Sequence, residues 1–357
     1  MPLDLTASAA DITRAICDIP SESGSEAHLA DLIEESIRGL HHLEVIREGN
    51  TIVARTNLGR AQRVAIAGHI DTVPINGNVP TRDVEVDGVP MIWGRGTVDM
   101  KAGVAVQLKL AAELVEPAVD ITWMWYDNEE VEAARNGLKL LAESRPDLFQ
   151  ADFAILGEPS NGEVEGGCNG TLRAVVRTTG VRAHSARAWI GENAIHRAAP
   201  ILARLAEYRP REIAVDGLDY REGMNAVRIS GGIAGNVIPD LCEVEVNYRF
   251  APSRSAAAAE AHVRNVFVGF DVEITDVAEG ARPGLDAPIA QEFVAAVGAT
   301  PKPKYGWTDV ARFSALGIPA VNYGPGDPHL AHHDEERVPI VQITATEDGL
   351  RSWLRGA

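Results

Sequence analysis

Cysteine is scarce in this chain, with 3 residues among 357. Cys17, Cys168 and Cys242 lie far apart and form no CxxC pair, which argues against a thiolate zinc site. Three scattered cysteines also give no basis for a disulfide framework. We therefore expect reduced thiols with a structural role.

Positive charge is scarce as well. Lys and Arg number 33 against 51 Asp and Glu, which gives a formal net charge of -18. Because binding to a nucleic-acid backbone needs a basic surface, we expect no nucleic-acid partner. No apolar run approaches the roughly 20 residues that span a bilayer, and the first residues lack a basic segment followed by an apolar one. We expect no membrane partner and a cytoplasmic location.

The remaining composition, 45% hydrophobic and 24% charged residues, is that of a folded chain long enough for two domains. Helical and strand patterns alternate over residues 1–172 and 282–357, which predicts an α/β domain. Residues 173–281 contain strand and helix patterns in the order β-α-β-β-α-β, which predicts a small ferredoxin-like α+β domain. The smaller domain is therefore expected to be inserted into the larger one.

Three short apolar runs predict buried central strands, at residues 64–67, 121–126 and 153–156. Residues suited to a cation follow each run: His69 and Asp71 after the first, Glu129 and Glu130 after the second, and Glu158 after the third. In an open α/β sheet, ligands collect beyond the carboxyl ends of the strands. The convergence of three strand ends predicts a cation site there.

Two further elements supply candidate ligands. A glycine-rich turn at residues 94–101 carries Asp99 just before a predicted helix, and His332 follows the last predicted strand. Asp99 could instead cap that helix, and the spacing leaves His333 open as an alternative to His332. A mixed set of imidazoles and carboxylates suits zinc or a similar transition ion better than calcium or magnesium.

The local spacing also suggests roles. Residues two apart in an extended segment face the same way, so Asp71 can brace the imidazole of His69. The side chains of the adjacent residues Glu129 and Glu130 point in different directions in an extended segment. One can therefore ligate a metal while the other acts as general base. Each piece alone is commonly structural, since paired glutamates usually lie on a solvated surface. Their conjunction after apolar strands indicates a hydrolytic metal site.

These motifs together resemble the dinuclear zinc amidohydrolases and exopeptidases of the M20 type, over nearly the whole chain. The resemblance implies a mixed-sheet zinc-exopeptidase catalytic domain with an inserted ferredoxin-like dimerisation domain. It implies two Zn²⁺ per subunit, with Co²⁺ as a possible substitute. One ion would be held by His69 and Glu158, the other by Glu130 and His332, and Asp99 would bridge both.

The same resemblance implies roles for the neighbouring residues. Asp71 would support His69, and Glu129 would be the general base. It also favours His332 over His333, because the family's histidine lies four positions before a glutamate, here Glu336.

Within the family, residues 127–133, 157–160 and 180–187 most resemble the succinyl-diaminopimelate desuccinylases of actinobacteria. The substrate implied is an N-acyl amino acid, N-succinyl-L,L-2,6-diaminopimelate, which would be hydrolysed to succinate and L,L-diaminopimelate. His184 would stabilise the developing oxyanion in the active site of the partner subunit of a homodimer. Without the resemblance, a loop histidine that caps the next helix is the simpler interpretation of His184.

Four more residues are candidates for holding the anionic substrate. Arg249, Asn236 and Thr171 offer polar groups, and an arginine can grip a carboxylate with two hydrogen bonds. Thr308 lies in a stretch that resembles the family's substrate loop, although Trp307 replaces the small residue often found there. Ordinary turn or strand-surface polarity is the alternative for Arg249, Asn236 and Thr171.

Two other functions fit the same residues. A sister deacylase or peptidase, such as an N-acetylornithine deacetylase, an aminoacylase or a dipeptidase, would keep the metal ligands and differ only in the pocket. A non-catalytic metal- or ligand-binding protein on the same fold would not need the extra glutamate, and the apparent base argues against it.

Overall fold

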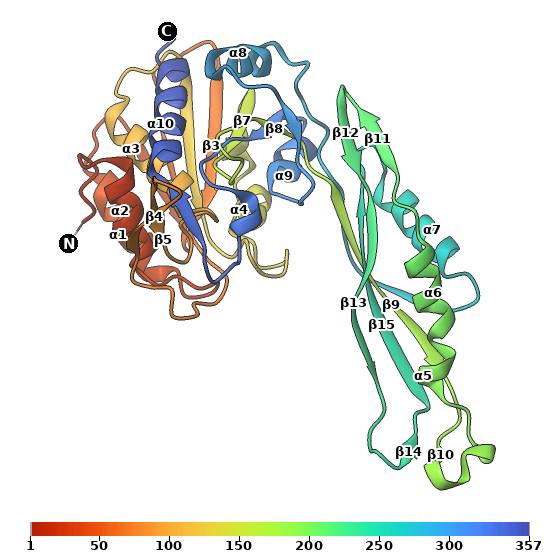
Figure 1. Ribbon diagram of the computed structural model, residues 1–357. Helices are drawn as coiled ribbons and strands as arrows, with labels where there is room; N and C mark the ends of the chain where they lie inside the picture. Colours follow the sequence, from red (N-terminus) through yellow and green to blue (C-terminus); the bar gives the residue numbers. More distant parts are fainter. Residues whose placement is uncertain (1, 357) are drawn as a thin grey trace. The chain divides into compact units, whose positions relative to one another are not determined.

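In the computed structural model, which describes residues 2–356, the chain divides into two compact units. Unit 1 contains the residues up to Gly166, Pro283–Lys302 and the residues from Arg312 onward. Unit 2 contains Gly167–Arg282 and Pro303–Ala311. The fold is mixed α/β with an inserted α+β unit, as the sequence pattern predicts (Figure 1).

Unit 1 is built on an eight-stranded sheet in the order β1-β2-β6-β3-β7-β18-β8-β17. The four central strands β6, β3, β7 and β18 run parallel, so their carboxyl ends meet at one edge. The bounds are β1 (Glu44–Glu48), β2 (Thr51–Arg55), β3 (Arg63–His69), β6 (Asp120–Tyr126), β7 (Phe153–Leu156), β8 (Glu165–Gly166), β17 (Lys302–Pro303) and β18 (Ala320–Asn322).

A separate three-stranded sheet and seven helices complete the larger unit. The sheet has the order β19-β5-β4, with β4 (Arg82–Val86), β5 (Val89–Trp93) and β19 (Arg337–Pro339). The helices are α1 (Ala9–Cys17), α2 (Ala27–Arg38), α3 (Lys101–Glu113), α4 (Gly137–Ser144), α8 (Pro288–Val297), α9 (Val310–Ala315) and α10 (Ile340–Leu354), and short 3₁₀ turns cover Pro146–Phe149 and Pro328–Leu330. Helix α9 begins in unit 2 and ends in unit 1.

The central strands are apolar because both faces are covered. All seven residues of β6 are buried, and on one face Trp123 stacks on Trp125 with ring centroids 6.4 Å apart. These indoles belong to a single core with buried side chains of α1, α2, α3, α8 and α10. Burial of this apolar surface is the main favourable term for unit 1.

Helix α3 approaches the sheet closely next to the strand ends. A Cβ at Gly103 would come within 2.1 Å of the carbonyl oxygen of Gly157, so only glycine fits there. Gly157 directly precedes Glu158. The absence of a side chain at residue 103 therefore lets helix α3 pack against the turn that carries the predicted metal ligand Glu158.

Unit 2 contains a four-stranded antiparallel sheet in the order β13-β15-β9-β16. The chain order is strand, helices, strand, strand, helix, strand, which confirms the predicted β-α-β-β-α-β arrangement. The bounds are β9 (Gly170–Thr179), α5 (Ala194–Arg197), α6 (Ala199–Glu207), β13 (Gly223–Gly231), β15 (Leu241–Phe250), α7 (Ala256–Val266) and β16 (Asp271–Ala278). Unit 2 also contains two short strand pairs, β10 (Ala183–His184) with β14 (Val237–Ile238) and β11 (Glu212–Val215) with β12 (Leu218–Arg221). A 3₁₀ turn covers Ser185–Ile190.

The segment Pro303–Ala311 packs with unit 2, although the sequence pattern placed residues 282–357 with the larger domain. The backbone N–H of Asn169 donates to the carbonyl of Lys304 at 3.2 Å. The thiol of Cys168 lies 3.7 Å from the carbonyl oxygen of Thr308. These contacts attach the returning chain to the residues that directly precede β9.

All three cysteines are free and buried, in line with a structural role. Burial raises the pKa of the Cys17 thiol to about 12 and that of Cys168 to about 11. Among the described helices, none has the length and apolar character needed to cross a bilayer.

Because the two units have separate cores, a cavity in unit 2 should act locally. Phe267 is fully buried in the core of unit 2. Replacing it by Ala should lower the free energy of unfolding by about 3–5 kcal/mol, with hydrogen-exchange protection lost in β9 and β15 and kept in β3 and β6. Val268→Ala, at a side chain that is 66% exposed, is the control and should change little. Equal loss of protection in both units would contradict the separation of the cores.

Candidate metal centre

Three strand ends lie side by side at the carboxyl edge of the large sheet. His69, the last residue of β3, stands opposite Tyr126 of β6, and Ala67 stands opposite Leu156 of β7. The turns after β6 and β7 carry Glu129, Glu130 and Glu158. The register of the parallel strands therefore brings candidate ligands from distant parts of the sequence to one place.

Two clusters of ligand atoms share Asp99. The side chains of His69, Asp99 and Glu158 lie within 4.8 Å of one another, and so do those of Asp99, Glu130 and His332. Asp99 Oδ1 is 3.1 Å from His69 Nε2, and Asp99 Oδ2 is 3.3 Å from His332 Nε2. One carboxylate thus presents an oxygen to each histidine. A carboxylate placed in this way can bridge two cations.

The surrounding carboxylates raise the pKa of both histidines. Burial alone would lower the pKa of His69, but hydrogen bonds to Asp71 and Asp99 outweigh burial and hold the pKa well above 6.5. Hydrogen bonds to Asp99 and Glu130 raise the pKa of His332 to about 10. The same histidines keep the pKa of Asp99 below its ordinary value despite burial. The pocket therefore stabilises positive charge, and a divalent cation can take the place of the protons.

The donor set fits a zinc-type ion. It combines two imidazoles with carboxylates and contains no thiolate, and its inner part is buried while the side chain of His332 is 53% exposed. His332 approaches Glu130 at 2.9 Å, whereas His333 Nδ1 accepts the backbone N–H of Glu335 at 3.1 Å. The structure thus places His332, and not His333, beside the other candidate ligands.

Asp71 contacts more groups than the sequence suggested. Its backbone oxygen and carboxylate Oδ1 lie 3.1 and 3.5 Å from His69 Nδ1. The same carboxylate accepts the backbone N–H groups of Glu129 at 3.0 Å and Glu130 at 3.1 Å, and the hydroxyl of Ser23 at 2.7 Å. Asp71 therefore orients the imidazole and fixes the turn that carries the paired glutamates.

A second buried carboxylate holds the start of the same turn. Glu26 Oε1 accepts the backbone N–H of Asn128 at 3.2 Å and that of Gly24 at 2.7 Å. Three consecutive N–H groups, at residues 128, 129 and 130, thus donate to buried carboxylates. The sequence contains no signal for Glu26 or Ser23, because both precede the first apolar strand and belong to no local motif.

Glu336 holds the turn of Asp99. Its side chain is 1% exposed, and Oε1 accepts the backbone N–H groups of Val98 at 2.8 Å and Asp99 at 3.0 Å. Oε2 pairs with Arg95 Nη1 at 3.0 Å, and the same Nη1 donates to the carbonyl of His333 at 3.3 Å. Glu336 therefore fixes the position of the shared carboxylate and ties it to the loop of His332. Its spacing from His332 was a signal in the sequence, but gave no hint of this contact.

The other predicted residues all lie in unit 2. Thr171 of β9 stands opposite Arg249 of β15. At the far end of the sheet, His184 pairs with Val237, and Asn236 accepts the backbone N–H of Ser185 at 2.9 Å through its carbonyl. Thr308, by contrast, contacts Cys168.

His184 caps the 3₁₀ turn that follows it, as the simpler interpretation expects. Its Nδ1 accepts the backbone N–H of Ala186 at 3.0 Å. A neutral imidazole that accepts at Nδ1 carries its proton at Nε2. The exposed side of His184 therefore offers a hydrogen-bond donor.

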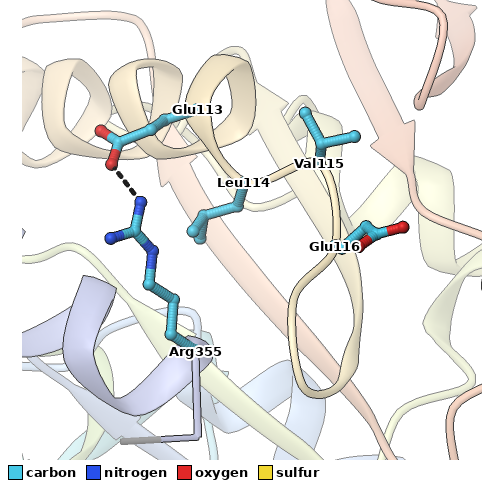
Figure 2. A pocket seen from close by; sticks show the side chains of 5 residues that line it. All are labelled: Glu113, Leu114, Val115, Glu116 and Arg355. Carbon is cyan, nitrogen blue, oxygen red and sulfur yellow. Dashed lines mark hydrogen bonds and ion pairs between the residues drawn. The ribbon is translucent and has the colours of Figure 1, made fainter.

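A surface hollow at the end of α3 is a poor alternative site. It is lined by Glu113, Leu114, Val115, Glu116 and Arg355 (Figure 2). Arg355 Nη2 donates to Glu113 Oε1 at 2.7 Å, so one of its two carboxylates is neutralised by a neighbour. The hollow contains no histidine and no cluster of ligand atoms.

Comparison with known proteins assigns the chain to one peptidase family. The model of peptidase family M20/M25/M40 matches residues 65–355. A protein of Mycobacterium tuberculosis H37Rv, provisionally assigned as the succinyl-diaminopimelate desuccinylase DapE, is 55% identical over 99% of this chain and 100% of its own length. The succinyl-diaminopimelate desuccinylase of Corynebacterium glutamicum is 46% identical over 99% of this chain and 97% of its own.

Solved structures share the fold at low sequence identity. A tripeptidase from Staphylococcus aureus superposes with a TM-score of 0.78 at 21% identity, covering 99% of both chains. A metallo-carboxypeptidase from Sulfolobus solfataricus also superposes with a TM-score of 0.78, at 16% identity. The superposition covers 98% of this chain and 99% of that protein's chain.

The Glu336 contacts generate a prediction about metal binding and stability. Glu336→Ala leaves the buried Arg95 with only its longer pair to Asp334, at 3.8 Å, and removes the acceptor of two N–H groups. The free energy of unfolding should fall by about 3–5 kcal/mol, and zinc affinity, measured by equilibrium dialysis, should fall by about 10–100-fold. Exposed Glu335→Ala is the matched control and should change neither quantity. If the two variants bind zinc equally well, Glu336 does not position Asp99.

Proposed function

Because the chain belongs to peptidase family M20/M25/M40, we propose that it hydrolyses N-succinyl-L,L-2,6-diaminopimelate to succinate and L,L-diaminopimelate. The substrate follows from the two actinobacterial relatives, which match 99% of the chain at 55% and 46% identity. The reaction would serve diaminopimelate and lysine biosynthesis. The observation that carries the chemistry is the carboxylate of Asp99 between two histidines at the strand ends.

For the metals, the proposal assigns His69 and Glu158 to one Zn²⁺ and Glu130 and His332 to the other, with Asp99 bridging. The two clusters of ligand atoms that share Asp99 support this assignment. Co²⁺ is the expected substitute, because it accepts the same nitrogen and oxygen ligands. Two divalent cations held there would polarise the scissile carbonyl and make a water molecule more acidic.

Glu129 is the proposed general base. Its carboxylate belongs to a cluster with His69 and Glu130, and its backbone is fixed by Asp71. In the proposed mechanism Glu129 takes a proton from the attacking water and later delivers it to the leaving amine. Asp71 acts through its neighbours, because it orients the imidazole of His69 and the turn that carries the base.

Arg249, Asn236, Thr171 and Thr308 are proposed to bind the substrate, and His184 to donate a hydrogen bond to the oxyanion. Thr171 and Arg249 face each other at one end of the sheet, whereas His184 and Asn236 follow its other end. Arg249 lies eight positions from Leu241 along β15, a span of about 26 Å at roughly 3.3 Å per residue. One small substrate therefore cannot contact both Arg249 and His184 on the same copy of unit 2.

A homodimer resolves this separation, with His184 of the partner subunit acting at the site. The edge strand β13 offers a surface for a second copy, because its backbone is unpaired on one side and Val227 and Ile229 are 62% and 50% exposed. The cytoplasmic location stays a prediction from the sequence.

Substrate choice tests the proposed function most simply. The zinc-loaded chain should hydrolyse N-succinyl-L,L-2,6-diaminopimelate with a kcat/KM about 100-fold or more above that for N-acetylornithine or simple dipeptides, because polar pocket groups lose their partners with the shorter substrates. The measurement is initial rate against substrate concentration for each compound. A higher kcat/KM for acetylornithine or a dipeptide would assign the chain to a sister activity.

The role of Glu129 has its own test. Glu129→Gln keeps the size of the side chain but cannot take up a proton, so kcat should fall by about 100- to 10,000-fold. Zinc content per chain should stay at the wild-type value, since the proposed ligands are intact. The exposed Glu132→Gln serves as the control and should keep normal turnover. Near-normal kcat in zinc-loaded Glu129→Gln would remove Glu129 as the base.

A further inference from the structure

The sheet of unit 2 has one face toward its helices and one open face. Figure 1 shows α5, α6 and α7 along one side of this sheet. Side chains of β9 and β15 alternate between buried and accessible positions, and the buried ones join the core with α6 and α7. The accessible positions include Thr171, Arg173, Arg177, Asn247 and Arg249. The open face therefore carries several arginines on neighbouring strands.

Two of the arginines on this open face are neutralised by carboxylates. Arg177 pairs with Glu243 at 2.7 Å and with Glu273 at 2.6 Å, and Arg228 of β13 pairs with Glu245 at 3.2 Å. In this half of the open face, positive and negative charges thus balance within the sheet itself.

Arg173 and Arg249 differ from the other arginines. Neither forms an ion pair with any of residues 2–356, although Asp276 stands opposite Arg173 on β16. Arg249 donates its Nε–H to Asn247 Oδ1 at 3.1 Å, and Asn247 Nδ2 donates to Thr171 Oγ1 at 3.2 Å. Asn247 thus orients the guanidinium of Arg249 without neutralising its charge.

The register brings the two unpaired charges together. Thr171 stands opposite Arg249, and Arg173 stands opposite Asn247, so the two arginines are diagonal neighbours on one face. Diagonal neighbours in an antiparallel sheet lie about 7–8 Å apart, within reach of long side chains. Burial, and then the positive charge of Arg173, lower the pKa of Arg249. Two like charges side by side are unfavourable unless an anion joins them.

We propose that Arg173 and Arg249 together form a carboxylate-binding subsite, in which Arg173 is a determinant of substrate affinity. A planar guanidinium matches a carboxylate with two parallel hydrogen bonds, and a second one adds charge and direction. The identity of the ligand rests on the proposed function, because N-succinyl-diaminopimelate carries carboxylates on both of its halves. The bound carboxylate is a group that does not react.

Steady-state kinetics with a matched control tests the subsite. Arg173→Met removes one of the two charges, whereas Arg177→Met removes the same charge from the same strand and face at a position that is already paired. With the zinc-loaded full chain, Arg173→Met should raise KM for N-succinyl-L,L-2,6-diaminopimelate by about 10–100-fold, with kcat nearly unchanged. Arg173→Lys should show a smaller rise, and Arg177→Met none. Equal KM values for Arg173→Met and Arg177→Met would overturn the proposal.

A binding measurement separates this proposal from the proposed function. Succinate and L,L-diaminopimelate are titrated separately into the zinc-loaded wild type and both variants by calorimetry. We expect at least one of these carboxylates to bind Arg173→Met about 10-fold or more weakly than Arg177→Met. If the wild type fails to hydrolyse the succinyl substrate, the proposed function falls, but the titration still decides the subsite. Equal affinities in the two variants, or no binding to the wild type, would overturn it.

Discussion

The placement of the Asp99 carboxylate between His69 and His332 is the contact on which the candidate site depends. Each of its two oxygens lies within 3.3 Å of one imidazole nitrogen, and each imidazole lies beside a further carboxylate. Negative charge therefore accumulates in a largely buried pocket, where it is costly unless cations compensate it. The carboxylates raise the pKa of both histidines, which favours positive charge there. Divalent ions can supply the same positive charge, because the clustered nitrogen and oxygen atoms are of the kinds that bind metals.

The surrounding structure is arranged to keep these side chains in place. Asp71 and Glu26 accept three successive backbone N–H groups of the turn after β6, and Glu336 accepts two from the turn that carries Asp99. Buried carboxylates thus serve here as acceptors for backbone donors that would otherwise be unsatisfied. Both turns lie at the ends of packed elements, since β6 is fully buried and α3 begins directly after Asp99. The candidate ligands are therefore anchored to a packed core.

The sequence predicted the fold better than it predicted the contacts around the site. The apolar runs at 121–126 and 153–156 coincide with β6 and β7, because strands covered on both faces have a continuous hydrophobic pattern. The same pattern shows where the strands end, so the sequence predicted His69, Glu130 and Glu158 as candidate ligands beyond those ends. Glu336 was visible only as a spacing from His332, since its partner Val98 lies 238 residues away along the chain. Local periodicity carries no information about such a contact, and the same holds for Glu26 and for the attachment of Thr308 to unit 2.

The proposed dinuclear site requires the Asp99 carboxylate to bridge two divalent ions. The most direct measurement is anomalous diffraction at the zinc absorption edge from crystals of the zinc-loaded chain. Two strong peaks are expected on either side of the Asp99 carboxylate, one beside His69 and Glu158 and the other beside Glu130 and His332. A single peak, no peak at this edge of the sheet, or two peaks that Asp99 does not join would contradict it.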